Sequence, residues 1–219
     1  IKAIQFKNQA NLGSWLSNFG VYVPTKSTSR TLTTLYDIQI VSLEVIGVVT
    51  NTPAIDAYRG AGRPEANYTM ERLMDKIAFD LQIDRVEVRK VNLIQPEQIP
   101  YKTVCSGTID SGNMPALFDD ALRNADVEGF RERYENSLKN GFFRGLGIAL
   151  YLESCGNGKD GGVDIRFNKD GDVIIYAAQM ENGQGHQTTL TQIFSDRLGY
   201  DAGKIRVIQG NSRISPSGN

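Results

Sequence analysis

The periodicity of the sequence changes at Asp56-Ala57-Tyr58-Arg59-Gly60-Ala61-Gly62-Arg63-Pro64-Glu65. Before this stretch, apolar and polar residues alternate at 3–6 and 43–49, which predicts two strands. After it, apolar residues recur at helical spacing over 70–81, and Pro64 stands where the first position of a helix is expected. The stretch is therefore predicted to be the loop that joins an extended region to the first long helix.

Further along the chain the pattern predicts both helices and strands. Asp84 is a typical N-cap for a short helix that reaches about residue 91. One helix is predicted over 119–140, with a buried stripe of Val127, Phe130, Tyr134 and Leu138. A helix over 188–198 is predicted to turn Leu190, Ile193, Phe194 and Leu198 inward. Strands are predicted at 146–152, 163–167, 173–177 and 205–208, with a hairpin turn at Asn168-Lys169-Asp170-Gly171.

This succession of elements predicts an α+β fold with mixed sheets and packed helices. Loops are predicted at 11–34 and 95–111, where turn residues and prolines are frequent. The expected organisation is a first subdomain at 1–117, a helical connector at 118–141 and a second subdomain at 142–219. The start at Ile1 and the turn-rich end lead us to expect a piece of a longer protein.

Composition argues against several functional classes. The 24 Lys and Arg residues and the 25 Asp and Glu residues give a net charge of −1, so no nucleic-acid partner is expected. No apolar run approaches the roughly 20 residues of a membrane span, and no signal peptide is seen, which favours a cytoplasmic location. Cys105, Cys155 and the single histidine, His186, are scattered, so no metal held by protein side chains is expected.

The loop around residue 60 has the chemistry of an anion site. Its glycines allow the backbone to approach a ligand closely, and Arg59 and Arg63 can present planar sets of donors. The N-terminus of the following helix adds amide donors and partial positive charge. The alternative is an ordinary turn whose arginines pair with Asp56 and Glu65.

A second glycine loop is Glu181-Asn182-Gly183-Gln184-Gly185-His186-Gln187-Thr188-Thr189, between a predicted strand and a predicted helix. Successive backbone amides in such a loop can form an anion-binding nest, and the helix dipole strengthens it. The Gln184 amide can pair with a ligand that offers both a donor and an acceptor. The loop fits neither a dinucleotide fingerprint nor a Walker loop. The alternative is a glycine turn that only caps the helix.

Several motifs together resemble one family. The run at 51–66 is similar to the active-site loop of molybdenum hydroxylase large subunits, the superfamily of xanthine dehydrogenase, aldehyde oxidase and carbon monoxide dehydrogenase. The run at 183–189 resembles the molybdopterin-contacting loop of that family. Other motifs follow in family order at Met70-Glu71-Arg72, 89–93, Pro100-Tyr101 and Asp110-Ser111-Gly112. The version at 57–63 is similar to the form II large chain of carbon monoxide dehydrogenases.

The resemblance implies roles for individual residues. The active-site loop, facing the substrate, would be Arg59, Gly60, Ala61, Gly62 and Arg63. The cofactor contacts would be Arg59, Gln184, Gly185, His186, Thr188 and Thr189. No protein ligand to the metal is implied, because the pterin sulfurs hold molybdenum in this family. The catalytic glutamate of the family would lie beyond Asn219, so no catalytic residue is expected in this chain.

Two positions depart from better-known members of the family. Carbon monoxide oxidisers carry a copper-binding cysteine where Gly60 stands, and glycine cannot hold that ion. Xanthine and aldehyde oxidases carry a phenylalanine where Ala61 stands, and alanine removes that stacking ring. The resemblance therefore argues against carbon monoxide as the substrate and against purine recognition by the same stacking.

The resemblance also implies an activity and partners. The parent enzyme would bind molybdopterin, as its cytosine dinucleotide, and would oxidise an electron-poor carbon of an aldehyde or N-heterocycle with oxygen from water. Iron–sulfur clusters and FAD on partner subunits or domains would accept the electrons. The chain alone, without the rest of the large subunit, is expected to be inactive and to bind no cofactor. The alternative is a stand-alone, non-catalytic binding or interaction module on the same scaffold.

Overall fold

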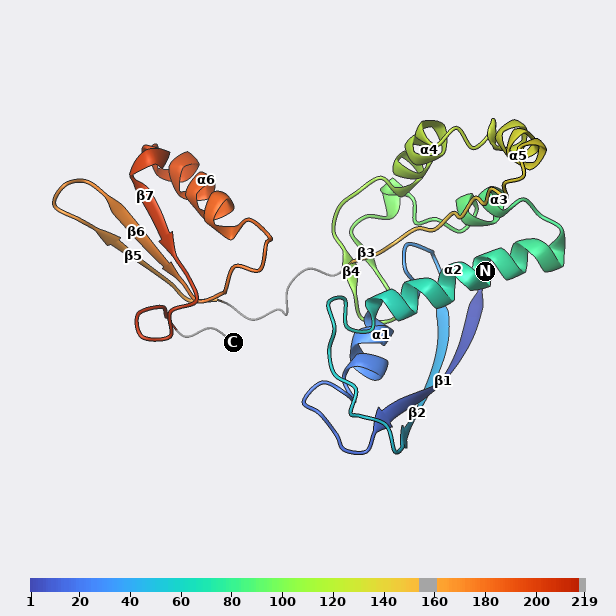
Figure 1. Cartoon of the computed structure of the whole chain (residues 1–219), viewed down its shortest axis with the longest axis horizontal. Helices are drawn as coiled ribbons and strands as arrows, with labels where there is room; N and C mark the ends of the chain where they lie inside the picture. Colours follow the sequence, from blue (N-terminus) through green and yellow to red (C-terminus); the bar gives the residue numbers. More distant parts are fainter. Residues whose placement is uncertain (154–160, 217–219) are drawn as a thin grey trace. The chain divides into compact units, whose positions relative to one another are not determined.

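The computed structural model describes residues 1–153 and 161–216, which belong to two compact units, Ile1–Ser154 and Cys155–Asn219. Both units contain helices and sheets (Figure 1), which confirms the predicted α+β class. None of the helices in these ranges is long and apolar enough to cross a membrane.

The longer sheet of the first unit has two parallel strands, β1 (Ala3–Gly13) and β2 (Ile40–Val49). Both are longer than predicted. Their connection was predicted to be a loop, but it includes a π-helix, η1 (Val23–Ser27), and a short helix, α1 (Thr28–Arg30). These turns bury Val23, Ser27 and Thr28 in place of an apolar stripe, so helical periodicity could not identify them.

The long helix α2 (Arg63–Leu81) begins where the sequence predicts it, directly after the loop around residue 60 (Figure 1). The predicted short helix is also confirmed as α3 (Arg85–Lys90), and the Asp84 carboxylate accepts hydrogen bonds from the amides of Val86 and Glu87. In the predicted loop after it, short elements form: η2 (Pro96–Gln98) and a small hairpin of β3 (Tyr101–Lys102) and β4 (Thr108–Ile109).

The single helix predicted over 119–140 is wrong, since two helices occupy the region. These are α4 (Met114–Asn124) and α5 (Phe130–Lys139). Asp126 interrupts them with a left-handed φ of 46°, and its carboxylate accepts a hydrogen bond from the Gly129 amide. No residue of α5 is buried, so the predicted buried stripe is also wrong.

The segment 146–152 is not the predicted strand. Its backbone instead joins the core of the first unit, with Leu150 buried beside the apolar side chains of α2 and its neighbours. Side chains take the place of a partner strand: the Asn67 amide bonds both the N–H and the C=O of Leu152, at 2.8 and 3.1 Å. The apolar pattern suggested a strand, and the segment fails to form one because side chains occupy its backbone groups. The predicted division of the chain at 118–141 stays a prediction.

The second unit is a three-stranded sheet with one covering helix. The strands are β5 (Val163–Phe167), β6 (Val173–Ala177) and β7 (Ile205–Ile208), in the order β5-β6-β7. The hairpin between β5 and β6 is antiparallel, and Gly171 in its turn has a φ of 83°. All three strands and the turn confirm the prediction.

Helix α6 (His186–Leu198) connects β6 to β7, which are parallel, and it is followed by η3 (Ala202–Lys204). Phe194 is buried against Val173, Ile175 and Val207, with Leu190 packed beside them. The other two side chains predicted to point inward, those of Ile193 and Leu198, are exposed.

Candidate functional site

The loop around residue 60 is held in a conformation that requires glycine. Gly60 and Gly62 have φ values of 100° and 94°. A Cβ at Gly62 would overlap the carbonyl oxygen of Val23 and lie 2.8 Å from the Thr28 Oγ1. Since Thr28 Oγ1 also donates a hydrogen bond to the Gly62 carbonyl at 3.2 Å, the loop is pressed against the start of α1. Its backbone course is thus fixed by packing within the first unit.

The same geometry bears on the missing copper-binding cysteine. A Cβ at Gly60 would lie 2.6 and 2.8 Å from ring carbons of Pro64, in a left-handed backbone that side chains rarely adopt. This loop conformation does not accommodate a cysteine at that position. Glycine offers no thiolate at this position, and the contact with Pro64 would in addition exclude a cysteine side chain from this loop conformation.

The two arginines of the loop differ in their partners. Arg63 forms an ion pair with Glu153, and not with Asp56 or Glu65, the partners expected under the alternative of an ordinary turn. The Asp56 carboxylate instead accepts a hydrogen bond from the amide of Ala57 at 2.7 Å. Across the described ranges, Arg59 forms no ion pair and its side chain is exposed. Arg59 is consequently the arginine that is available to an anionic ligand.

The second loop is an anion-binding nest in the structure. Oε1 of Glu181 accepts hydrogen bonds from the amides of Gly183 and Gly185 at 2.9 and 3.0 Å, and Oε2 accepts one from the amide of Gln187 at 3.4 Å. Partial burial raises the pKa of Glu181, but the backbone donors outweigh it and hold the pKa below its usual value. The sequence prediction named the nest and overlooked the carboxylate that opens it.

The predicted contact residues of this loop mostly bond to the loop itself. Gln184 accepts a hydrogen bond from the Asn182 amide at 2.6 Å and donates one to the Met180 carbonyl at 3.1 Å. The Thr189 hydroxyl donates to the Gly185 carbonyl at 3.0 Å. These bonds preserve the turn before α6. Cofactor contacts by Gln184 and Thr189 stay predictions, since both side chains would exchange partners to reach a ligand.

His186 and Thr188 stand where the loop enters α6. Nδ1 of His186 lies 3.4 Å from the Gln184 amide nitrogen and 3.3 Å from the Gln209 amide nitrogen. Both amide nitrogens can donate to Nδ1 in the tautomer that carries its proton on Nε2. The contact between His186 and Gln209 joins the beginning of α6 to the residue that follows β7.

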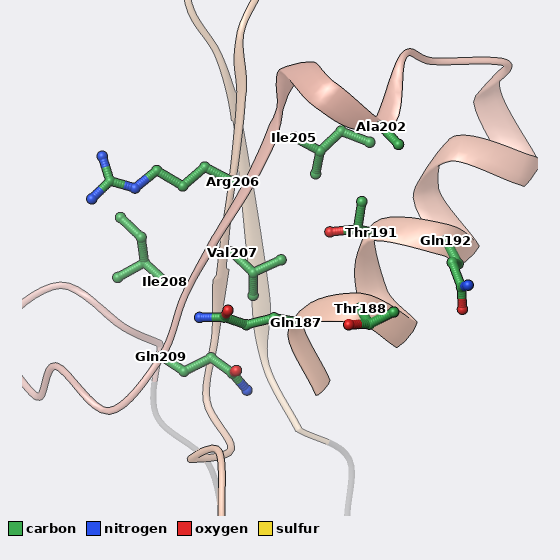
Figure 2. A pocket seen from close by; sticks show the side chains of 10 residues that line it. All are labelled: Gln187, Thr188, Thr191, Gln192, Ala202, Ile205, Arg206, Val207, Ile208 and Gln209. Carbon is green, nitrogen blue, oxygen red and sulfur yellow. The ribbon is translucent and has the colours of Figure 1, made fainter. Parts of the chain in front are cut away.

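A groove of about 780 Å³ lies beside this junction (Figure 2). Figure 2 shows Ile205 and Val207 pointing from β7 toward α6, while Arg206 and Ile208 point to the opposite side of the strand. Amides and hydroxyls dominate the polar lining, which comprises Gln187, Thr188, Thr191, Gln192, Arg206 and Gln209. The groove therefore offers neutral donors and acceptors, whereas the Arg206 guanidinium points away from α6.

The residues that the structure describes form no metal centre made of protein side chains. In the described ranges, no cluster of three or more His, Cys, Asp or Glu side chains could hold a metal ion. Burial raises the pKa of the Cys105 thiol, which disfavours its thiolate. The other cysteine, Cys155, lies outside the described residues.

Comparison with known proteins identifies the family of the chain. Two matches to families described as "Molybdopterin cofactor-binding domain" cover residues 1–93 and 120–219. The chain belongs to the molybdopterin-binding large subunits of the molybdenum hydroxylase family.

Named relatives are oxidoreductases of this family. The chain is 34% identical to the carbon monoxide dehydrogenase large chain of Afipia carboxidovorans over 84% of this chain and 25% of that protein. It is 29% identical to the nicotine 6-hydroxylase large subunit of Paenarthrobacter nicotinovorans over 83% of this chain and 24% of that protein. The chain thus spans about a quarter of the length of these curated relatives.

Solved structures give the same result. Quinoline 2-oxidoreductase from Pseudomonas putida 86 superimposes with a TM-score of 0.87 at 26% identity, covering 95% of this chain and 28% of that one. The Cu,Mo-CO dehydrogenase has a TM-score of 0.79 at 28% identity, covering 99% of this chain and 30% of that one. The fold is therefore that of part of a molybdenum hydroxylase large subunit.

Proposed function

We propose that the chain supplies two cofactor-contacting loops to a molybdenum hydroxylase that oxidises an electron-poor carbon of an aldehyde or N-heterocycle. The observation that carries this proposal is the nest at 183–187, whose backbone amides already bind a carboxylate in the structure. Amides that converge on a carboxylate also suit the phosphate oxygens of a cofactor.

The residues present fit a molybdopterin. A pterin supplies the metal ligands through its own sulfurs, so the fit depends on the backbone of the loops. Gly183 and Gly185 face open space, since a Cβ there would meet nothing within 4 Å, so a ligand can approach their backbone. When bound, the group would supply two-electron oxidation of carbon with oxygen derived from water.

The proposed division of labour follows the geometry of each loop. The loop from Arg59 to Arg63 would border the substrate, and Arg59 would also contact the metal end of the cofactor. Gly185, His186, Thr188 and Thr189 would hold its phosphates with amides, hydroxyls and the dipole of α6. Gln184 would donate a hydrogen bond near the metal after releasing the Met180 carbonyl.

Further features of the parent enzyme are proposed from family membership. They are the cytosine dinucleotide form of the cofactor, electron transfer to iron–sulfur and FAD-containing subunits or domains, a cytoplasmic location, and a first and second subdomain joined at 118–141. The relatives named as large chains or large subunits support the multi-subunit part of this proposal.

Two measurements separate this function from a stand-alone binding module. The complete enzyme, assembled with its partner subunits, is expected to contain about one molybdenum per large subunit and to reduce a dye with an aldehyde or N-heterocycle. The 219-residue chain alone is expected to purify without molybdenum. Stoichiometric molybdenum on the isolated chain would contradict its expected dependence on the remaining large subunit. A complete assembly that lacks molybdenum would favour the binding module.

A further inference from the structure

The environment of Arg63 contains a residue that the loop motifs do not include. Glu153 pairs with the Arg63 guanidinium, and their side chains are 40% and 22% exposed. The Tyr151 hydroxyl donates a hydrogen bond to the other carboxylate oxygen of Glu153 at 3.1 Å. The same hydroxyl oxygen is the next group, after Pro64, that a Cβ on Gly60 would meet, at 4.0 Å. Arg63, Glu153 and Tyr151 thus form a cluster against the loop.

The backbone that carries Glu153 is fixed to α2 immediately before it. Asn67 is buried, and its amide bonds both backbone groups of the adjacent Leu152. The Asn67 amide nitrogen also donates to the carbonyl of Arg63 at 2.8 Å. One buried side chain therefore links the first turn of α2 to the segment that presents Glu153.

A second buried group holds the same segment five residues earlier. Arg89 is fully buried and donates a hydrogen bond to the carbonyl of Ile148 at 3.0 Å. Its other donors bind the carboxylates of Glu71 and Asp75 at 2.8 and 2.9 Å. The segment 148–153 is consequently anchored at both ends, so that Glu153 meets Arg63 from a rigid support.

We propose that Glu153 is a positioning residue for the loop at 59–63: it holds and neutralises Arg63, and thereby leaves Arg59 as the side chain of this loop that meets an anionic ligand. The second half of this statement rests on the proposed function. The first half concerns the loop alone and can be tested without cofactor.

Trypsin provides a local test on the 219-residue chain. The Arg59–Gly60 bond is cleavable, whereas Pro64 protects the bond after Arg63. Loss of a partly exposed ion pair changes a local equilibrium by about two- to fivefold. We therefore expect Glu153→Gln to accelerate cleavage after Arg59 by about two- to fivefold. Glu65→Gln removes the same charge from the adjacent first turn of α2 and is expected to leave the rate unchanged.

Two further variants separate positioning from general loss of structure. Glu153→Asp is expected to restore part of the protection, and the exchanged pair Arg63→Glu with Glu153→Arg is expected to restore most of it. Cleavage after Lys90 in the same digest reports the stability of the unit. Equal rates in Glu153→Gln and Glu65→Gln would overturn the proposal, as would equal acceleration after Arg59 and Lys90.

The assembled enzyme tests the role of Arg59 separately. Arg59→Ala is expected to lower its molybdenum content severalfold, while Glu65→Gln, which removes a charge outside the loop at 59–63, is expected to retain most of it. The reverse order would overturn the assignment of Arg59. Faster trypsin cleavage in Glu153→Gln together with an assembled wild-type enzyme that binds no molybdenum would support the positioning role and reject the proposed function.

Discussion

The two glycine loops of this chain are built by opposite means. At Gly62 the loop of the first unit is in contact with the backbone of Val23, and a Cβ has no space. At Gly183 and Gly185 a Cβ would meet nothing within 4 Å, and only the left-handed φ values of 96° and 77° favour glycine. The first loop is therefore shaped by what packs behind it, and the second by its own hydrogen bonds.

This difference has a consequence for binding. A loop with fixed packing can present Arg59 without reorganising, which lowers the entropic cost of holding a ligand. The nest of the second loop already contains an anion, because the amides of Gly183, Gly185 and Gln187 bind Glu181. An anionic ligand that uses those same donors must displace this carboxylate or share them with it.

The largest expected effect concerns the support of the first loop. Arg89→Ala leaves the Ile148 carbonyl without its donor and the buried Glu71 carboxylate without its positively charged partner, and it is expected to cost about 3–5 kcal/mol. Urea denaturation followed by fluorescence of Trp15, the single tryptophan, measures unfolding of this unit. Arg166→Ala, at an exposed ion pair of the second unit, is the control and is expected to leave the transition unchanged.

Burial also explains why the Tyr36 hydroxyl acts as a hydrogen-bond donor in this network. Desolvation raises the pKa of Tyr36, and its hydrogen bond to Glu71 at 2.6 Å adds to the increase. Tyr36 therefore remains a proton donor to the carboxylate that Arg89 binds. A small stability loss in Arg89→Ala, within about 1 kcal/mol, would show that this network does not anchor the segment 148–153.

The second prediction compares the glycines directly. Gly62→Ala adds a left-handed alanine and a steric clash, so a loss of about 2–4 kcal/mol is expected. Gly185→Ala adds only the backbone penalty, about 1–2 kcal/mol. Hydrogen exchange measured by mass spectrometry reports each unit in the same sample. Equal losses at the two positions would remove the distinction between the loops.

The third prediction uses the acidity of Glu181. Because the pKa of Glu181 is lowered in the folded chain, its stabilising contribution is complete above the ordinary glutamate pKa, about 4.3, and is lost as the pH falls through the lowered value. The protection of 183–189 against hydrogen exchange, taken relative to the intrinsic rate at each pH, is expected to fall in that acid range. Glu181→Gln is expected to exchange faster near neutral pH and to lose this acid-dependent step. An unchanged step in the variant would assign it to another group.

Much of this architecture could be predicted from the sequence, and the exceptions have physical reasons. Helix α2 and the hairpin before β6 were predictable because Pro64 and Gly171 set the local backbone and the apolar spacing agrees with it. The break at Asp126 was missed because a left-handed aspartate is a local choice that periodicity does not record. The strand predicted at 146–152 failed because its backbone partners are the side chains of Asn67 and Arg89.

The candidate site likewise has features that the sequence could predict and features that it could not. Glycines and arginines near one another in the sequence indicated two anion-binding loops. The partner of Arg63 could not be predicted, since Glu153 lies 90 positions further along the chain and only the packing of 148–153 brings the two together. Glu181 was a different case: it adjoins the loop, and an acidic residue just before a glycine-rich turn was a usable indication of a filled nest.

The most direct test of cofactor binding by both loops is the molybdenum content of the assembled enzyme, measured by mass spectrometry on matched variants. Arg59→Ala in the first loop and Gly185→Val in the second are each expected to reduce molybdenum severalfold, whereas Glu65→Gln is expected to retain the wild-type content. Wild-type molybdenum in both loop variants, with the proteins folded and assembled, would contradict the account.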